Sequence, residues 1–255
     1  MRKRIAGRLH PSLIAVWAAI VAVGNILPTI PILGTGSTFS LSTILSPLSG
    51  IFFGPLAGAL CSAAGGFIGS LIAPHTAWLG MGTFIIGTTT AFTAGCIAWG
   101  NWPVVRVNRK GSFVVNGGII VYLTGTILWF TQETGRSIIL FPVVCYGLGF
   151  AALIAGSIFA HRMFADTRHV LKFPAIWLCS FGGLLGGAAV GNFFSLVLYR
   201  LPRELWAVIM FTAPFERAVF SLGAAMAGAP LLTGLSKIGI FAGPGYEEEK
   251  KLTPP

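Results

Sequence analysis

Long apolar stretches of about 20 residues recur along the whole chain, and this repetition constrains the fold more than any other feature. A helix that crosses a bilayer needs about 20 mostly apolar residues, because each residue adds about 1.5 Å against a hydrocarbon core of roughly 30 Å. The chain is 55% hydrophobic and 9% charged, whereas about a quarter of a soluble domain is charged. The sequence therefore predicts an all-α, polytopic transmembrane helix bundle.

Eight stretches have the length and composition of spanning helices. They are residues 12–32, 39–53, 55–73, 79–100, 113–130, 138–160, 175–199 and 215–235. The second is short and contains Pro47, so it is either kinked or extended by the residues before it. Residues 205–213 are apolar but too short to cross, which predicts an interfacial or partly inserted helix. We treat residues 1–237 as one transmembrane domain and residues 238–255 as a charged cytoplasmic tail.

The Lys and Arg residues predict the orientation, because cytoplasmic loops retain positive charge. With the N-terminus inside, only four of the 17 fall outside: Arg136, Arg200, Arg203 and Arg217. This bias favours an even number of spans with both termini cytoplasmic, in a multi-pass protein of the cell membrane. The topology also explains the net charge of +10. No polar segment combines basic and aromatic residues as a nucleic-acid site would, so we expect no nucleic-acid partner.

Motifs of catalysis and of metal binding are missing from the sequence. There is no GxxxxGK[ST] loop to cradle nucleotide phosphates and no HExxH pair to ligate zinc. The four cysteines all lie inside predicted spans without CxxC spacing, which favours small buried side chains over a disulfide or a metal site. We therefore expect no catalytic residue, no metal and no cofactor, and we do not expect an enzyme.

Polar and aromatic residues gather instead at the predicted outer side, where they are candidates for binding a substrate. Ionisable groups near the hydrocarbon are costly, so they are usually paired or face a cavity. The candidates are Asn25, Ser37, Thr38, Phe39, Trp78, Glu133, Asn192 and Glu216. A structural role is an open alternative for several of them. Glu133 could pair with Arg136, Glu216 with Arg200 or Arg203, and Asn192 could join two helices by a hydrogen bond.

Small residues recur at intervals of four, which allows two helix backbones to approach closely. The glycines of this kind are Gly58, Gly65, Gly66, Gly69, Gly182, Gly183, Gly186, Gly187 and Gly191. The first predicted helix carries Ala15 with Ala19, and Ala18 with Ala22, on neighbouring faces. Packing within the chain is the default interpretation, and a docking surface for another subunit is the more specific one.

Three regions of the sequence carry a resemblance to a known family. Residues 39–60 read FSLSTILSPLSGIFFGPLAGAL and are followed by the small residues of 65–69. Together they resemble the second and third helices of the substrate-binding S components of energy-coupling factor (ECF) vitamin transporters. The sequence APFERAV, from Ala213 to Val219, is similar to the start of that family's last helix, and Ala15 with Ala19 matches its AxxxA pattern. Gly66 stands where the family often has an acidic residue.

The resemblance implies a function and a set of partners. The chain would capture a vitamin or micronutrient from outside, in a pocket closed by the loop around Ser37, Thr38 and Phe39. The alanines of the first helix would then dock onto a transmembrane coupling subunit that is driven by two separate ATPases. Because S components usually have six helices, the eight predicted here imply an inserted pair around residues 113–160.

Two other classes of protein remain open at the sequence level. A stand-alone secondary transporter or channel needs a path through the middle of the membrane, and the centres of the predicted spans hold no ionisable residue. A membrane-embedded enzyme needs a convergent set of His, Asp or Glu, and only scattered outer glutamates are present. The sequence does not name the substrate.

Overall fold

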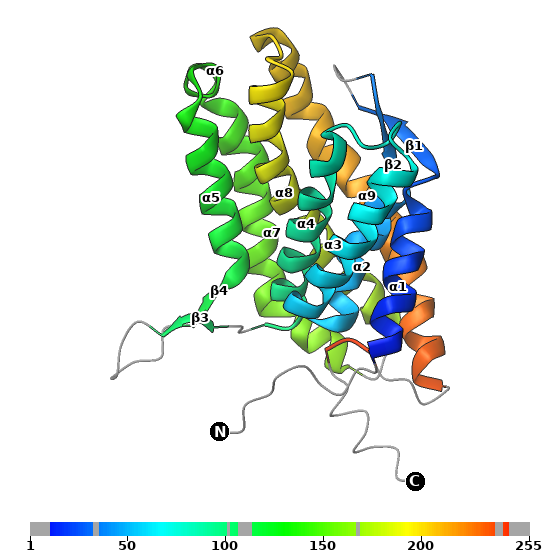
Figure 1. Cartoon of the computed structure of the whole chain (residues 1–255). Helices are drawn as coiled ribbons and strands as arrows, with labels where there is room; N and C mark the ends of the chain where they lie inside the picture. The colour runs from blue at the N-terminus through cyan, green and yellow to red at the C-terminus, as the bar shows by residue number, and fades with distance from the viewer. Residues whose placement is uncertain are drawn as a thin grey trace.

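The structure is a computed structural model that describes residues 11–32, 36–100, 103–106, 114–166, 169–237 and 242–244. Eight helices of twelve or more residues pack side by side in this part of the chain (Figure 1). They are α1 (Pro11–Gly24), α2 (Ser42–Phe53), α3 (Pro55–Ile72), α4 (Phe84–Ala98), α5 (Gly117–Thr131), α7 (Leu140–Ala165), α8 (Lys172–Leu198) and α9 (Arg203–Lys237). The predicted class, a transmembrane helix bundle, is confirmed.

Short elements join these helices at the two ends of the bundle. Hairpin β1–β2 (Pro28–Pro31 and Thr38–Ser40) connects α1 to α2, and hairpin β3–β4 (Pro103–Arg106 and Val114–Asn116) connects α4 to α5. The others are η1 (Gly80–Thr83), α6 (Glu133–Ser137) and η2 (His169–Leu171). Helix α1 begins and α9 ends at one end of the bundle, while β1–β2 and α6 lie at the opposite end (Figure 1). We call the end with β1–β2 the outer end, following the charge pattern.

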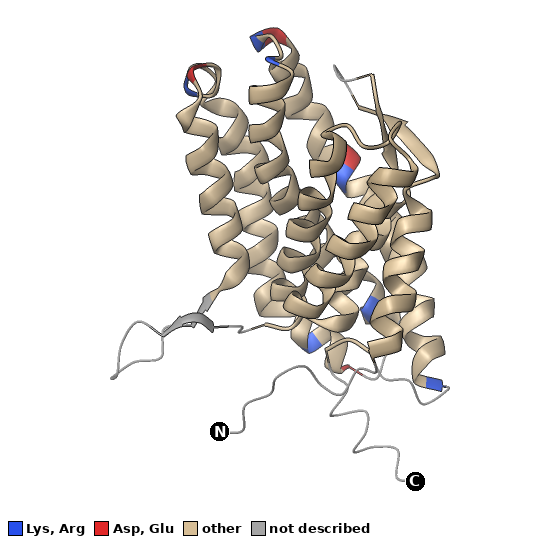
Figure 2. Ribbon diagram, in the orientation of Figure 1, with Lys and Arg blue, Asp and Glu red and all other residues tan. Residues whose placement is uncertain are grey.

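Five helical segments of the described chain are long and apolar enough to cross a membrane: 55–72, 80–98, 140–165, 172–198 and 203–237. Helices α1, α2 and α5 are apolar but have only 12 to 15 residues. The eight predicted segments thus correspond to eight helices, of which three are shorter than expected. Figure 2 shows charged residues gathered at the two ends of the bundle, with one red and blue pair lying between them.

Several predicted boundaries were wrong, and proline and capping residues explain why. The first span was predicted to run to residue 32, but α1 ends at Gly24 and the prolines Pro28 and Pro31 lie in strand β1. Proline lacks an N–H and biases the preceding residue toward extended backbone. The fifth span was predicted from residue 113, but α5 begins at Gly117, where the Asn116 side chain accepts a 2.9 Å hydrogen bond from the Gly118 N–H.

Residues 205–213 are not a separate interfacial helix, because they form the first third of the 35-residue helix α9. Pro214 lies inside this helix and cannot donate to the carbonyl of Met210 four residues earlier. The Cys145 thiol on α7 donates to that carbonyl at 3.6 Å. A neighbouring helix therefore supplies the hydrogen bond that the proline removes, which allows α9 to continue through it.

Helix α8 lies at the centre of the packing, in contact with α4, α5, α7 and α9. Its glycines permit this closeness: a Cβ on Gly183 would lie 2.9 Å from the carbonyl oxygen of Thr90, and one on Gly187 would lie 2.0 Å from the Thr90 hydroxyl. On α3, a Cβ on Gly65 would lie 2.4 Å from the carbonyl oxygen of Ala18. The small residues noted in the sequence therefore pack helices within the chain.

Most of the predicted tail, residues 238–255, lies outside the described residues. Residues 242–244 are described and contact the inner end of the bundle. The Gly243 N–H donates to the carbonyl of Phe52 at 2.9 Å, and Gly243 is buried. This bond satisfies a carbonyl at the C-terminal end of α2.

Candidate functional site

A polar cavity of about 80 Å³ lies beneath the β1–β2 hairpin, among α2, α3, α4, α8 and α9. Its wall is unusually rich in hydroxyl groups. These belong to Ser40, Ser42, Thr43, Ser46, Ser62, Thr76, Thr83 and Thr90. Ser42 and Ser46 are four residues apart on α2 and therefore share a face of that helix, while Thr83 lies at the end of η1 and Thr90 seven residues later on α4. A wall of this kind suits a ligand that forms many hydrogen bonds.

A smaller chamber of about 50 Å³ adjoins it, between the hairpin, α8 and the outer part of α9. Phe39, Trp78, Asn192 and Arg217 line both spaces and therefore form the partition between them. Trp206 lines the smaller chamber, and its indole N–H is buried without a hydrogen-bond partner in the described structure. We refer to the two spaces as the main cavity and the side chamber.

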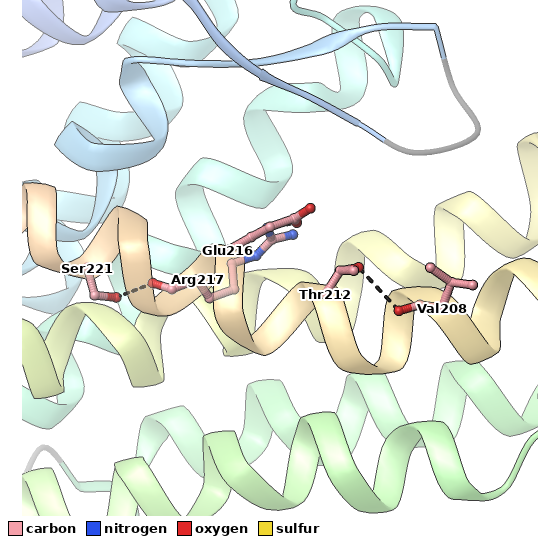
Figure 3. A network of polar contacts seen from close by, with 5 residues as sticks. All are labelled: Val208, Thr212, Glu216, Arg217 and Ser221. Atoms are coloured by element: carbon pink, nitrogen blue, oxygen red, sulfur yellow. Dashed lines mark hydrogen bonds and ion pairs between the residues drawn. The ribbon is translucent and has the colours of Figure 1, made fainter.

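Glu216 and Arg217 form an ion pair on α9, with Arg217 Nη1 3.2 Å from Glu216 Oε2. Figure 3 shows both side chains on the side of α9 that faces the β1–β2 hairpin. They are largely buried, with 13% of the Arg217 side chain and 18% of the Glu216 side chain exposed. The expected alternative partners of Glu216, Arg200 and Arg203, were wrong; Arg203 instead donates to the Ser137 carbonyl at 3.0 Å.

The depth of this pair also corrects the sequence analysis. The two residues were expected to open the last span, but α9 begins at Arg203, so Glu216 lies 13 residues into it. At 1.5 Å per residue this is about 20 Å along the helix. Glu216 and Arg217 therefore lie near the middle of α9, and not at its outer end as the sequence predicted. Ionisable residues at such depth usually mark a functional site.

Phe39 on strand β2 links the hairpin to this pair. The guanidinium carbon of Arg217 lies 4.7 Å from the centre of the Phe39 ring, which is a cation–π contact. The same ring packs edge-on against Phe220, with 5.3 Å between the ring centres. The hairpin is thereby held against α9 over the partition between the two spaces.

Asn25, which lines the main cavity, lies in a network of satisfied hydrogen bonds. Its Oδ1 accepts from Ser42 at 2.9 Å and from Ser40 at 3.2 Å, and its Nδ2 donates to the Val21 carbonyl at 3.0 Å. Its backbone carbonyl accepts from the Thr76 hydroxyl at 2.8 Å. Asn25 therefore ties the end of α1 to β2, to α2 and to the segment after α3.

Asn192 and Trp78 are less constrained by polar contacts. The Asn192 Nδ2 donates to the Tyr146 hydroxyl at 3.5 Å, which is a long hydrogen bond. Trp78 stacks on Tyr199 with 6.1 Å between ring centres, and the Tyr199 hydroxyl donates to the Trp78 carbonyl. Asn192 thus retains hydrogen-bonding capacity beside both spaces, and Trp78 offers an aromatic wall.

The structure brings five of the eight candidates to these two spaces and leaves three elsewhere. Asn25, Phe39, Trp78, Asn192 and Glu216 line one space or both. Ser37 and Thr38 lie in the hairpin but line neither space. Glu133 is exposed on α6, where neighbouring Arg136 donates to the carbonyls of Phe130 and Thr131. The sequence analysis missed the hydroxyl wall and Arg217 as a lining residue.

In the described part of the chain, His, Cys, Asp and Glu side chains form no group of three or more that could hold a metal ion. The site is therefore described by hydrogen-bonding groups, aromatic rings and one ion pair.

The fold and the cavity define a polytopic membrane protein with a polar cavity beneath the β1–β2 hairpin. The family model described as "ECF-type riboflavin transporter, S component" matches residues 10–142, just over half of the chain. The chain therefore belongs to the S components of ECF transporters, which are substrate-binding transporter subunits and not enzymes. The match ends at the start of α7. Neither curated proteins nor solved structures gave a significant match.

Proposed function

We propose that this chain captures a vitamin at the outer face of the cell membrane and delivers it for ATP-driven uptake. Riboflavin is the first candidate, because the matching family is that of ECF-type riboflavin transporter S components. The observation that carries the proposal is the main cavity, where a wall of hydroxyl groups, three aromatic side chains and Arg217 converge under the β1–β2 hairpin. A few placed polar groups in a pocket fix the orientation of a small ligand.

The size of the main cavity supports a role for the hairpin in ligand entry. Pockets that hold drug-sized ligands measure about 300–1,000 Å³, whereas the main cavity measures about 80 Å³. A ligand of vitamin size therefore requires the hairpin to move away from α9. The contacts of Phe39 with Arg217 and Phe220 are the ones that such a movement would break.

ATP-driven uptake requires partners that hydrolyse ATP, since the sequence lacks a P-loop. We propose a transmembrane coupling subunit with two ATPase subunits, docked on the lipid-facing side of α1. Ala15 and Ala19 are exposed on this helix, whereas Ala18 and Ala22 are buried in the bundle at 9% and 5% exposure. The proposed docking surface therefore keeps Ala15 and Ala19 and excludes Ala18 and Ala22.

Titration of the purified full-length chain with riboflavin tests the proposal. Binding is expected at submicromolar concentration and is measured by quenching of flavin fluorescence. Mass spectrometry of ligand retained through purification would identify another vitamin if riboflavin is not the substrate. Absence of binding to riboflavin, with no other vitamin retained, would contradict the proposal.

A stand-alone secondary transporter is a second candidate, which the intramembrane pair Glu216 and Arg217 favours. The two functions are distinguished by reconstitution of the chain alone into liposomes. Accumulation of ligand driven by an ion gradient, without any ATPase, would support the secondary transporter. Uptake only with the coupling subunit and ATPases, on addition of ATP, would support the ECF function.

A further inference from the structure

The two spaces contain a balanced pair of charges. Among the described residues that line them, Arg217 is the one basic residue and Glu216 the one acidic residue, and none is a histidine. The two groups are 3.2 Å apart. The lining therefore carries one positive and one negative charge, and its net charge is zero before a ligand enters.

The placement of the two groups matters for a ligand in the main cavity. Arg217 lines both spaces, whereas Glu216 lines only the side chamber. A ligand in the main cavity would therefore contact the Arg217 guanidinium, while the Glu216 carboxylate lies on the other side of that guanidinium, in the side chamber. An isolated arginine would favour an anionic ligand. The carboxylate at 3.2 Å offsets that preference, because it already neutralises the guanidinium.

A net charge on the ligand would have no counter-charge in this site. A buried charge without a partner is costly, and two like charges brought close together repel each other by several kcal/mol. An uncharged ligand avoids both penalties. An uncharged ligand can still accept hydrogen bonds from Arg217. The guanidinium has five N–H groups, and in the described structure it donates one hydrogen bond, from Nη1 to Glu216.

We propose that Glu216 makes this site select uncharged ligands, so that riboflavin is bound in preference to its 5′-phosphate ester. This inference rests on the proposed function and adds a specificity-determining residue to it. The phosphate ester carries about −1.5 to −2 charges near neutral pH, as phosphate monoesters do. Its phosphate and Glu216 would share the one guanidinium, so the site would hold an excess negative charge without a counter-charge.

The experiment measures the affinities of riboflavin and of riboflavin 5′-phosphate for the full-length chain. The wild type is expected to prefer riboflavin by about tenfold or more, in line with the cost of a like-charge contact. Glu216→Gln leaves Arg217 without its counter-charge, and the preference is expected to shrink by about tenfold through a gain in affinity for the ester. Glu204→Gln is the matched control, because Glu204 also neighbours an arginine on α9 but is exposed and lines neither space.

A variant of the other member of the ion pair, Arg217→Gln, tests the proposal if Glu216→Gln does not yield folded protein. Arg217→Gln leaves the negative charge alone, and the preference for riboflavin over the ester is expected to widen, even if both ligands bind more weakly. Equal affinities in the wild type, or a ratio that neither variant changes, would overturn the proposal while leaving riboflavin binding intact. If the wild type binds neither flavin, the proposal that riboflavin is the substrate fails, and this inference fails with it.

Discussion

Arg217 on α9 lies against the face of the Phe39 ring on strand β2, with 4.7 Å from its guanidinium carbon to the ring centre. Phe220, one turn further along α9, packs against the same ring at 5.3 Å. One aromatic side chain of the hairpin is therefore held by two residues of the last helix. Because the ring also lines both the main cavity and the side chamber, any opening of the hairpin must separate it from α9.

Replacement of Phe39 by Ala is expected to accelerate ligand release. A cation–π contact contributes about 0.5–2 kcal/mol and an aromatic pair about 0.5–1.5 kcal/mol. Since 1.4 kcal/mol corresponds to a factor of ten, the dissociation rate should rise by about tenfold. The rate is measured from the recovery of fluorescence after bound riboflavin is displaced by an excess of a non-fluorescent analogue.

Two further variants distinguish loss of the Phe39 contacts with α9 from a general loss of packing. Phe39→Tyr retains the ring and should release ligand at close to the wild-type rate. Phe211→Ala removes a phenylalanine from the same helix that is 73% exposed and lines neither space, so it should also leave release unchanged. A wild-type dissociation rate in Phe39→Ala would show that the hairpin does not limit release.

Asn25 and Asn192 are expected to respond differently to substitution by Ala. Asn25→Ala removes the acceptor shared by Ser40 and Ser42, so it should lower the melting temperature of the ligand-free protein by the equivalent of about 1–3 kcal/mol. Asn192→Ala breaks only a 3.5 Å bond to Tyr146, so the melting temperature should change little while ligand affinity falls. Thermal unfolding and flavin titration of both variants check this contrast, and equal effects on both quantities would refute it.

The helices could be predicted from the sequence because a membrane span has a simple requirement of length and hydrophobicity. All eight predicted segments contain a helix, and the packing role of Gly183 and Gly65 follows from their spacing. The length of α9 could not be predicted, because Pro214 normally interrupts a helix. Here the Cys145 thiol of another helix compensates, and that contact depends on the tertiary fold.

The site could be predicted only in outline. Residues such as Phe39, Trp78 and Asn192 have side chains that stand out in an apolar sequence, whereas serines and threonines also occur inside helices bonded to their own backbone. Ser49, for example, donates to the Leu45 carbonyl at 3.1 Å. The four-residue spacing of Ser42 and Ser46 could have indicated a polar face on α2. The position of Glu216 and Arg217 far inside α9 could not be predicted, because the sequence did not reveal that this helix begins at Arg203.

Ala19→Trp on α1 is expected to prevent assembly with the coupling subunit and to leave ligand binding intact. Ala19 is exposed on the proposed docking surface, and a bulky indole there would block close helix contact. Co-purification with co-expressed coupling and ATPase subunits measures assembly, and flavin titration confirms that the site is folded. Leu123→Trp is the control, because Leu123 is 55% exposed on α5, away from α1. Normal assembly of Ala19→Trp would exclude this surface.

Gly50→Ala on α2 is expected to destabilise the bundle strongly. A Cβ at this position would lie 1.8 Å from the Ala91 carbonyl oxygen and 2.8 Å from the Gly95 nitrogen, so α2 and α4 must separate to admit it. Overpacking of this kind costs about 1–3 kcal/mol or more, which corresponds to a fall in melting temperature of about 2–12 °C at 2–4 °C per kcal/mol.

Gly147→Ala provides the matched control for this test, since Gly147 also lies inside a helix but a Cβ there would meet no atom within 4 Å. Alanine has the higher helix propensity, so this variant should be as stable as the wild type or slightly more stable. The two melting temperatures are compared in the same detergent, without ligand. A Gly50→Ala protein as stable as Gly147→Ala would mean that α2 and α4 do not approach as closely as the structure shows. Because both helices line the main cavity, the positions of its lining residues would then also be wrong.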